Sequence, residues 1–457
     1  MNFMRTFLQR ILSWIEKTPF LRLFVIFAVL RVVATIGIVT VFELDPDEDY
    51  YDNIARELLA GDGYQIEDAR GPDLLRTPVY TYFLTGLFWI SGEEPNSGDP
   101  KLDNGRINKL VFAAQIALDL LTAWLIFLTA RRLLGNLAAR LGMLFVLAYP
   151  VTAIYTGRYL AETLFFLLVI AFALFLGRAL ADGRWRDYAL AGLMLGLGAL
   201  AKPVLLYFVP MLPILALAPV VVASSRQNLE AIRQERPKTT PTRPRLRRFA
   251  ALAAAGAIGI LVCVPWMVRN SKVTGEFVTM GTSGGFSIWL GNNLEFDGRD
   301  KDELDQAGQE LFDQRLREII GSGNPHTTEG SKILGDVAKK SMLENPGAST
   351  WLLFRKCWRF WFDIYGPENK KFGLAVIPIQ IVGFVLGVAG LILAIRRRIF
   401  IWDWLFIVLM MNGLHALVTS TMRYSASVMP LVLCLAAWFL VQIARAKPGL
   451  GKRAARG

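Results

Sequence analysis

Residues 23–52, LFVIFAVLRVVATIGIVTVFELDPDEDYYD, indicate the class of fold. The first 20 of these positions are almost all apolar, and a helix of about 20 residues, at about 1.5 Å each, crosses the roughly 30 Å hydrocarbon core of a bilayer. Six carboxylates follow within residues 43–52, where the chain leaves the run. Because no small-residue cleavage site follows the run, we expect an uncleaved membrane anchor rather than a signal peptide.

The composition extends this pattern to the whole chain. Of 457 residues, 54% are hydrophobic and 19% are charged, and the mean hydropathy is +0.40. Soluble proteins carry about 25% charged residues. The sequence therefore predicts an all-α polytopic membrane protein with about 10 transmembrane helices (range 9–12) and two large outward loops that carry short helices. The long apolar runs cover residues 23–42, 110–130, 137–156, 159–177, 188–201, 203–223, 249–268, 373–395, 400–418 and 425–443.

The net charge of +12 separates by membrane side. The two terminal segments and the short connections that alternate with the long ones hold 26 basic and five acidic residues. The two long connections, 43–109 and 269–372, hold 20 basic and 30 acidic residues. Since Lys and Arg favour the cytoplasmic side, both termini are predicted to be cytoplasmic and both long loops to face outward, in a multi-pass plasma (bacterial inner) membrane protein. The basic excess is then a topology signal, and no nucleic-acid partner is expected.

The same division predicts the organisation of the chain. It comprises a cytoplasmic N-terminus (1–22), a transmembrane core (23–268) with outer loop 43–109 and a basic cytoplasmic linker (224–248), a second outer loop or small helical domain (269–372), C-terminal transmembrane helices (373–443) and a basic tail (444–457). With three scattered cysteines and two histidines, a His/Cys metal cluster is not expected. Nucleotide-binding glycine motifs are absent from the sequence, so ATP-driven or hydride chemistry has no support.

The acidic segment after the first run has three interpretations. It fits a solvated cap at the start of a helix over residues 50–60, which Gly61 and Gly63 would end. It equally fits a general base for a hydroxyl, or oxygen ligands for a divalent cation. An apolar run over residues 79–91 is too short to cross and is expected to lie in the interface or re-enter.

Two intramembrane carboxylates follow. Glu162 lies at the outer end of its predicted span, four residues after Arg158, so it is a functional candidate or half of a structural ion pair with that arginine. Asp119, like Arg31, lies within a run, and we expect Asp119 to cap or to hydrogen-bond a neighbouring helix rather than take part in chemistry.

A set of short motifs runs in order from about residue 40 to 435. It resembles GT-C superfamily glycosyltransferases, especially the protein O-mannosyltransferase and lipid A aminoarabinose transferase group (glycosyltransferase family 39). The matching segments are Asp47-Glu48-x-Tyr50-Tyr51, Gly61-x-Gly63-Tyr64, Arg76-x-Pro78-x-Tyr80, Tyr155-x-x-Arg158-x-x-x-Glu162, Ala199-Leu-Ala-Lys202-Pro203, Pro265-Trp266-x-x-Arg269-Asn270, Gly284-Gly285 with Trp289 and Asn292, and Arg423-Tyr424.

The resemblance implies a reaction and roles for residues. Such enzymes move a sugar from a polyprenyl-phosphate or polyprenyl-diphosphate donor to an acceptor on the non-cytoplasmic face, usually with inversion. Asp47 matches the catalytic acidic position, where it would accept the acceptor hydroxyl's proton; Glu48 is its neighbour and Glu162 matches the second acidic position. The cations that would stabilise the leaving phosphate, each of which could instead be an interfacial anchor, are Arg76, Arg158, Lys202, Arg269 and Arg423.

The sequence leaves some features open. Arg76-Thr77-Pro78 stands where relatives carry a basic residue and two prolines. Some relatives use a divalent metal and others do not, so a metal cofactor is possible, while His415 is a poor lone ligand and is expected to be buried. The acceptor could be glycan, lipid or protein. A transporter or flippase of lipid-linked sugars and a non-catalytic envelope-assembly scaffold are the alternative functions.

The second outer loop is predicted to hold helices over residues 302–320 and 333–343, the latter broken by Pro346. Residues 351–362 mix aromatic and basic side chains, so they are expected to lie in the membrane interface, which would hold the loop to the bilayer. The alternative is that they grip the polyprenyl chain of the donor.

Overall fold

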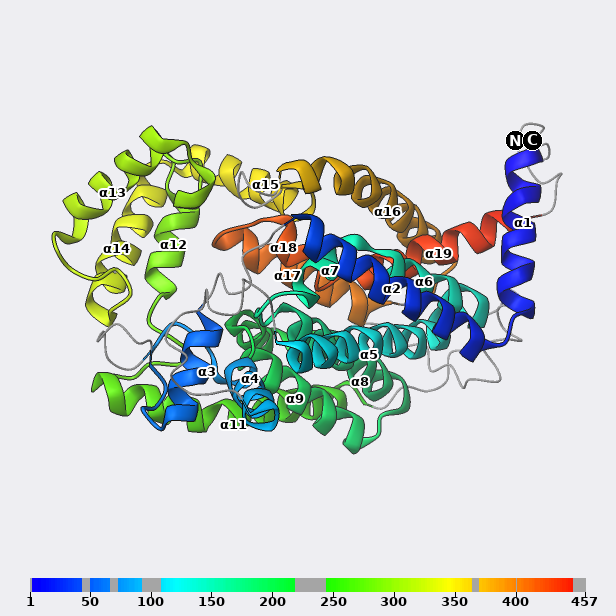
Figure 1. The fold of residues 1–457 in the computed structure, drawn as a ribbon, viewed down its shortest axis with the longest axis horizontal. Coiled ribbons are helices and arrows are strands. Elements are labelled where there is room, and N and C mark those ends of the chain that lie inside the picture. Colours follow the sequence, from blue (N-terminus) through cyan, green and yellow to red (C-terminus); the bar gives the residue numbers. More distant parts are fainter. Residues whose placement is uncertain are drawn as a thin grey trace.

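The computed structural model describes residues 2–42, 50–65, 73–92, 108–217, 244–363, 370–399 and 401–446. Within these residues the chain is mostly helical and forms no β-strand, which confirms the predicted all-α class. Asp47, Glu48, most of the basic linker (224–243) and the tail from residue 447 lie outside the described residues. Figure 1 shows a long bundle, with α12–α14 at one end and α1 at the other.

The helices have the following bounds. They are α1 (Asn2–Lys17), α2 (Phe20–Phe42), α3 (Tyr51–Ala60), α4 (Pro78–Ser91), α5 (Lys109–Leu134), α6 (Asn136–Ala148), α7 (Pro150–Thr156), α8 (Glu162–Asp182), α9 (Trp185–Ala199), the 3₁₀-helix η1 (Pro203–Ala216), α11 (Arg245–Thr274), α12 (Gly284–Asn292), the 3₁₀-helix η2 (Lys301–Glu303), α13 (Gln306–Ile320), α14 (Thr328–Glu344), α15 (Pro346–Phe362), α16 (Lys370–Arg396), α17 (Trp402–Leu417), α18 (Met422–Ser425) and α19 (Met429–Arg445).

Each predicted apolar run coincides with one or two of these helices. Within the described residues, five helices (α2, α5, α8, α11 and α16) are long and apolar enough to cross a membrane, and α6 with α7 makes a sixth if this pair, bent by 55°, is one span. The apolar helices η1, α17 and α19 are shorter. The molecule is therefore a multi-pass membrane protein, and the count of 10 crossings stays a prediction.

The bundle is held together by close helix contacts around α8, which is the most buried of the long apolar helices. On α9, Gly192 and Gly196 lie one turn apart against α11: a Cβ at Gly192 would stand 2.3 Å from the carbonyl oxygen of Ala255, and one at Gly196 would stand 2.7 Å from that of Gly259. Small residues spaced in this way let two membrane helices approach closely. The two glycines therefore allow α9 to lie close against α11.

Short helices cover one end of the bundle. In the long connection 43–109, which is predicted to face outward and is called the first outer loop below, α3 ends at Gly61, whose φ of 88° suits glycine, and packs against α4, which begins at Pro78. In the second, α12, α13 and α14 share a small core that includes Trp289, Phe312 and Leu334. The two helices predicted in this loop are confirmed as α13 and α14, and α15 begins at Pro346.

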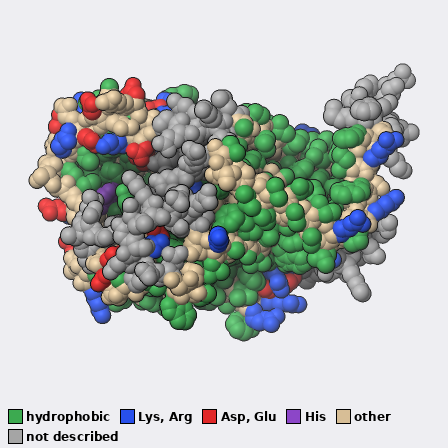
Figure 2. Space-filling model, viewed as in Figure 1, with side chains coloured by type: hydrophobic (Ala, Val, Ile, Leu, Met, Phe, Trp, Pro, Cys, Tyr) green, Lys and Arg blue, Asp and Glu red, His purple; other side chains and the backbone are tan. Residues whose placement is uncertain are grey.

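Charge is distributed unevenly along the long axis. Figure 2 shows acidic side chains concentrated over the end formed by α12–α14, a broad hydrophobic face along the bundle, and Lys and Arg at the opposite end beside α1. This arrangement agrees with the division of charge between alternate connections in the sequence.

Candidate functional site

The candidate site forms where α8 begins. Glu162 is the first residue of α8 and is 1% exposed. One of its carboxylate oxygens, Oε1, accepts a hydrogen bond from Nζ of Lys202 at 2.6 Å and another from Nε of Arg423. A carboxylate in the first turn of a helix is favoured by the helix dipole. Among the residues that the structure describes, Lys202 and Arg423 thus both pair with this one buried carboxylate.

Local sequence explains the position of Lys202. The residue before a proline is disfavoured in helical conformation, and Lys202, which precedes Pro203, is extended with φ −146° and ψ 123°. This ends α9 and turns the lysine side chain toward Glu162. The predicted basic-Pro turn is thus a cation-bearing corner between α9 and η1.

Arg423 reaches the site from the opposite end of the chain. It belongs to α18, a single turn that is fixed where the backbone N–H of Met422 donates to the carbonyl oxygen of Asp363 at 2.7 Å. Tyr424 stacks on His415, with ring centroids 4.0 Å apart and planes inclined by 11°, and Nζ of Lys202 lies 5.8 Å from the Tyr424 ring centroid. His415 is buried among the helices, as expected.

The turn bearing Arg76 is joined directly to the Lys202 corner. The hydroxyl of Thr77, 2% exposed, donates to the carbonyl oxygen of Ala201 at 2.9 Å, and the N–H of Val79 donates to that of Leu200 at 3.1 Å. The guanidinium of Arg76 lies 5.9 Å from the Tyr51 ring centroid. Thr77, the departure from the basic-Pro-Pro pattern, therefore supplies a hydrogen bond between the first outer loop and the residue before Lys202.

Arg269 secures the other side of this loop. Its guanidinium donates to the carbonyl oxygens of Asp73 at 2.7 Å and Tyr64 at 3.1 Å, and lies over the Trp266 ring, 4.7 Å from its centroid. Arg269 therefore holds the loop against α11 through bonds to the loop backbone, while Lys202 and Arg423 pair with Glu162.

Asp73, which did not stand out in the sequence, organises the same turn. Its carboxylate accepts the backbone N–H groups of Leu75 and Arg76 at 3.2 and 2.8 Å. Burial raises the pKa of Asp73, and these two hydrogen bonds oppose the rise. The only signal for Asp73 in the sequence was an acidic residue three positions before the candidate Arg76.

The remaining predicted residues are placed as follows. Arg158, 7% exposed, lies in the turn before α8, so Arg158 and Glu162 are not on successive turns of one helix as expected from their spacing. Asp47 precedes the first residue of α3 by four positions and, like Glu48, is not described. The described end of that acidic segment, Asp52, pairs with Arg56 at 3.1 Å.

Two further observations concern cofactor and structural roles. Within the ranges that the structure describes, no group of three His, Cys, Asp or Glu side chains could hold a metal ion. Arg31 and Asp119 form a buried intramembrane pair, with Nε 2.6 Å from Oδ2, which confirms that Asp119 bonds a neighbouring helix.

Comparison with known proteins supports the predicted resemblance. A sequence-family model described as dolichyl-phosphate-mannose-protein mannosyltransferase matches residues 104–230. No curated protein matches the sequence.

Solved structures give the fold. The oligosaccharyltransferase AglB from Archaeoglobus fulgidus, in complex with an inhibitory peptide and a dolichol-phosphate, aligns with TM-score 0.53 and 14% identity over 94% of this chain and 51% of its own. Its apo form aligns with TM-score 0.54 and 13% identity over 97% and 54%. ArnT from Cupriavidus metallidurans gives only TM-score 0.37, at 17% identity over 92% and 77%. The chain therefore has the GT-C fold and spans about half the length of the oligosaccharyltransferase it matches.

Proposed function

We propose that this protein is an integral-membrane glycosyltransferase that moves a sugar from a polyprenyl-phosphate-linked donor to an acceptor hydroxyl on the extracytoplasmic face. The observation that carries the proposal is the convergence of Lys202 and Arg423 on buried Glu162 within a GT-C fold. The partial match to a family of dolichyl-phosphate-mannose-dependent transferases supports a lipid-linked sugar as donor.

The cluster suits a departing phosphate. As the acceptor oxygen attacks the anomeric carbon, the bond to the lipid phosphate breaks and its electron pair leaves on the phosphate oxygen. Cations held ready in a poorly hydrated site stabilise that charge without rearranging. The side chains of Lys202 and Arg423 are 20% and 12% exposed, so they are largely desolvated yet reachable from outside the protein. Glu162 positions both cations.

Asp47 is the proposed general base. It accepts the proton that the acceptor hydroxyl loses, and back-side attack inverts the anomeric centre. In the sequence, Asp47 precedes α3, which is followed by the turn that bears Arg76. Thr77 in that turn is hydrogen-bonded to Ala201, the residue before Lys202. This connection supports an active site in which the base and the phosphate-binding cations face one substrate. Glu48, Arg76 and Arg158 are proposed to line the same site.

The orientation is part of the proposal. Nε2 of Gln9 donates to the carbonyl oxygen of Ala444 at 2.8 Å, so the first helix and the end of the last one share one end of the molecule. The excess of Lys and Arg in the short connections indicates that this end faces the cytoplasm, in the plasma or bacterial inner membrane. Thiol labelling of single-cysteine variants at Arg10 and Asp62 tests this: only the cysteine at residue 62 should react with an impermeant reagent from outside.

The test of function uses the purified full chain in nanodiscs. Asp47→Asn should abolish turnover and retain a polyprenyl-phosphate sugar, identified by mass spectrometry of the lipid that copurifies with it. Asp62→Asn, an exposed carboxylate after α3, is the control and should turn over normally. Wild-type turnover by Asp47→Asn would show that Asp47 is not the base, and lipid scrambling without sugar transfer would favour a flippase.

A further inference from the structure

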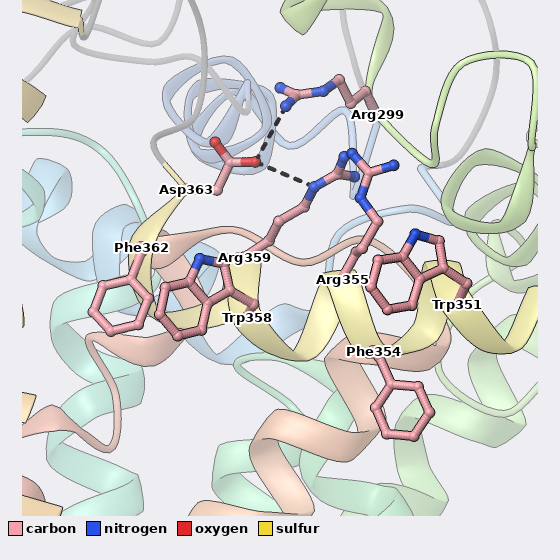
Figure 3. A pocket seen from close by; sticks show the side chains of 8 residues that line it. All are labelled: Arg299, Trp351, Phe354, Arg355, Trp358, Arg359, Phe362 and Asp363. Atoms are coloured by element: carbon pink, nitrogen blue, oxygen red, sulfur yellow. Dashed lines mark ion pairs between the residues drawn. The ribbon is translucent and has the colours of Figure 1, made fainter.

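Exposed aromatic side chains lie beside cations in the open pocket on α15 and along α1, at the other end of the molecule. In the pocket, Figure 3 shows Asp363 paired with both Arg299 and Arg359, and the pocket arginines also pair with Asp297 and Glu303. The charges of the pocket are therefore balanced within the protein. The surroundings of α1 differ in this respect.

The helix α1 carries apolar side chains on two adjoining sides. Leu12 and Ile15 are 4% and 2% exposed and pack into the core of the bundle. Phe7, Ile11 and Trp14 follow one another at intervals of four and three residues, so they share another side of the helix. These three side chains are 57%, 36% and 49% exposed. The apolar surface of α1 thus extends beyond the part that the bundle covers.

Hydrogen bonds fix α1 across the end of the bundle. Nη1 of Arg140, on α6, donates to the carbonyl oxygens of Ile15 at 3.0 Å and Thr18 at 2.8 Å. Figure 1 shows α1 running across the long axis of the molecule, whereas long apolar helices such as α5 and α16 run along it. Because those helices are the candidate membrane spans, α1 has the orientation of a helix that lies in the plane of the membrane surface.

The connection to α2 places α1 at the boundary of the bilayer. Only Thr18 and Pro19 separate α1 from α2, a candidate span of which 11% of the most apolar stretch is buried inside the protein. Leu21 and Val25, near the start of α2, are 67% and 50% exposed. The exposed apolar surface of this span therefore begins beside the end of α1.

Positive charge predominates around α1. Glu16 is the one carboxylate on α1 and on the two helices α6 and α19 that pack against it, and it pairs with Arg445 at 3.5 Å. The same three helices hold five cations, Arg5, Arg10, Lys17, Arg140 and Arg445.

Two of these cations border the exposed apolar side. Arg10 lies three positions after Phe7 and four before Trp14, and Lys17 lies three after Trp14. Both are exposed, and neither pairs with a carboxylate in the part of the chain that the structure describes. An aromatic side flanked by lysine and arginine is typical of helices that bind the surface of an anionic membrane.

From this orientation and this charge we propose that α1 lies in the interface of the adjoining leaflet and binds the head groups of anionic phospholipids. Phe7, Ile11 and Trp14 enter the boundary of the acyl chains, while Arg10 and Lys17 extend to the phosphates. In the orientation proposed above, this is the cytoplasmic leaflet. The surface shares no residue with the Glu162 cluster and is independent of the proposed sugar transfer.

Fluorescence quenching in vesicles tests the proposal. The full chain, with its three cysteines replaced by alanine, is labelled at Ile11→Cys or Ser13→Cys and reconstituted in phosphatidylcholine. Phosphatidylglycerol or phosphatidylcholine with a quencher on the acyl chain is then added in equal amounts. Quenching should be several-fold stronger at residue 11 than at residue 13, which lies off the apolar side. A label at Leu261, 67% exposed on the span α11, should be quenched equally by both lipids.

At residue 11, phosphatidylglycerol should quench about fivefold more effectively than phosphatidylcholine, since one cation near an anionic surface contributes about 1 kcal/mol, or about fivefold. Arg10→Gln with Lys17→Gln should remove most of this preference and leave quenching by phosphatidylcholine unchanged, because the apolar side is intact. Lys339→Gln with Lys340→Gln is the matched control: it removes the same charge from exposed positions of α14 and should keep the preference.

Three results would overturn the proposal. Equal quenching at residues 11 and 13 would show that α1 does not enter the bilayer. Equal quenching of residue 11 by the two lipids, or an equal loss of preference in the α14 variant, would exclude recognition of anionic head groups. Energy transfer between labels at residue 11 of two copies, without quenching by lipid, would assign this side of α1 to a second copy of the chain. If Ile11→Cys alters folding, a label at Phe7→Cys provides the same measurement.

Discussion

Nζ of Lys202 lies 2.6 Å from Oε1 of Glu162, although 40 residues separate them in sequence. Arg423 bonds to the same oxygen from a further 221 positions along the chain. The carboxylate is buried, so removing any one partner changes the charge balance of a poorly hydrated site.

Lys202→Met should lower the rate of sugar transfer by about 100-fold or more, because one preorganised cation facing the leaving phosphate is lost. Transfer from a radiolabelled polyprenyl-phosphate sugar measures the effect. Arg132→Gln is the control: Arg132 pairs with Asp182 at the same 2.6 Å distance, but at the end of α5. Equal losses in the two variants would assign Lys202 a structural role.

Thr77→Val should loosen the first outer loop, because it removes the bond to Ala201 and leaves that buried carbonyl without this donor, at a cost of about 1–3 kcal/mol. Limited proteolysis within residues 50–92 and the unfolding midpoint report the change. Thr85→Val removes a comparable hydroxyl bond within α4, to Thr81 at 2.9 Å, and should leave the loop as resistant as wild type. Unchanged proteolysis in Thr77→Val would show that the bond does not hold the loop.

Asp119→Asn should destabilise the bundle by about 3–5 kcal/mol, because it leaves buried Arg31 facing a neutral partner. Equilibrium unfolding in detergent measures this loss. The double replacement Arg31→Met with Asp119→Leu should recover most of it, since neither charge then remains buried. A double variant as unstable as the single one would mean that the pair itself, rather than the stranded charge, sets the stability.

Lys356 gives α15 a pH-dependent contact. Its side chain is fully buried and donates to the carbonyl oxygens of Gly291 and Val418 and to Oδ1 of Asn292. Burial, followed by the charge of Arg359, lowers the pKa of Lys356 from 10.5 to about 7. Between these two pH values the unfolded chain binds more protons than the folded one. The free energy of unfolding should therefore rise with pH from about 7 to about 10.5. Below pH 7 the contribution of Lys356 should be constant and at its lowest.

The unfolding midpoint of wild type and Lys356→Met, measured across that window, tests the assignment. The variant should show a flatter profile because methionine does not titrate. Parallel profiles would assign the pH dependence to other groups.

Gly192→Ala should push α9 away from α11, because the new methyl would meet the carbonyl oxygen of Ala255 at 2.3 Å. Such overpacking costs about 1–3 kcal/mol. Gly86→Ala in α4 is the control: nothing lies within 4 Å of the new atom, and alanine favours helix. Equal stability of the two variants would show that the helices adjust without cost.

The local elements of this protein could be predicted from its sequence because they depend on neighbouring residues. Apolar runs placed the bundle helices, Gly61 and Pro346 marked helix boundaries, and the division of charge between connections predicted which loops share a side. The exception is instructive: the spacing of Arg158 and Glu162 suggested one continuous helix, but the chain turns between them and α8 begins at Glu162.

The sequence by itself therefore determined an all-α membrane bundle with a polar, carboxylate-rich end, since helix formation and membrane partition follow from short-range composition. Only the tertiary structure decided that Lys202 and Arg423 pair with Glu162 and that Arg269 bonds to the backbone of the first outer loop. The physical reason is that these partners lie on helices whose contacts depend on packing, such as the close approach of α9 and α11 at Gly192, and packing across long sequence separations leaves no periodic signal in the chain.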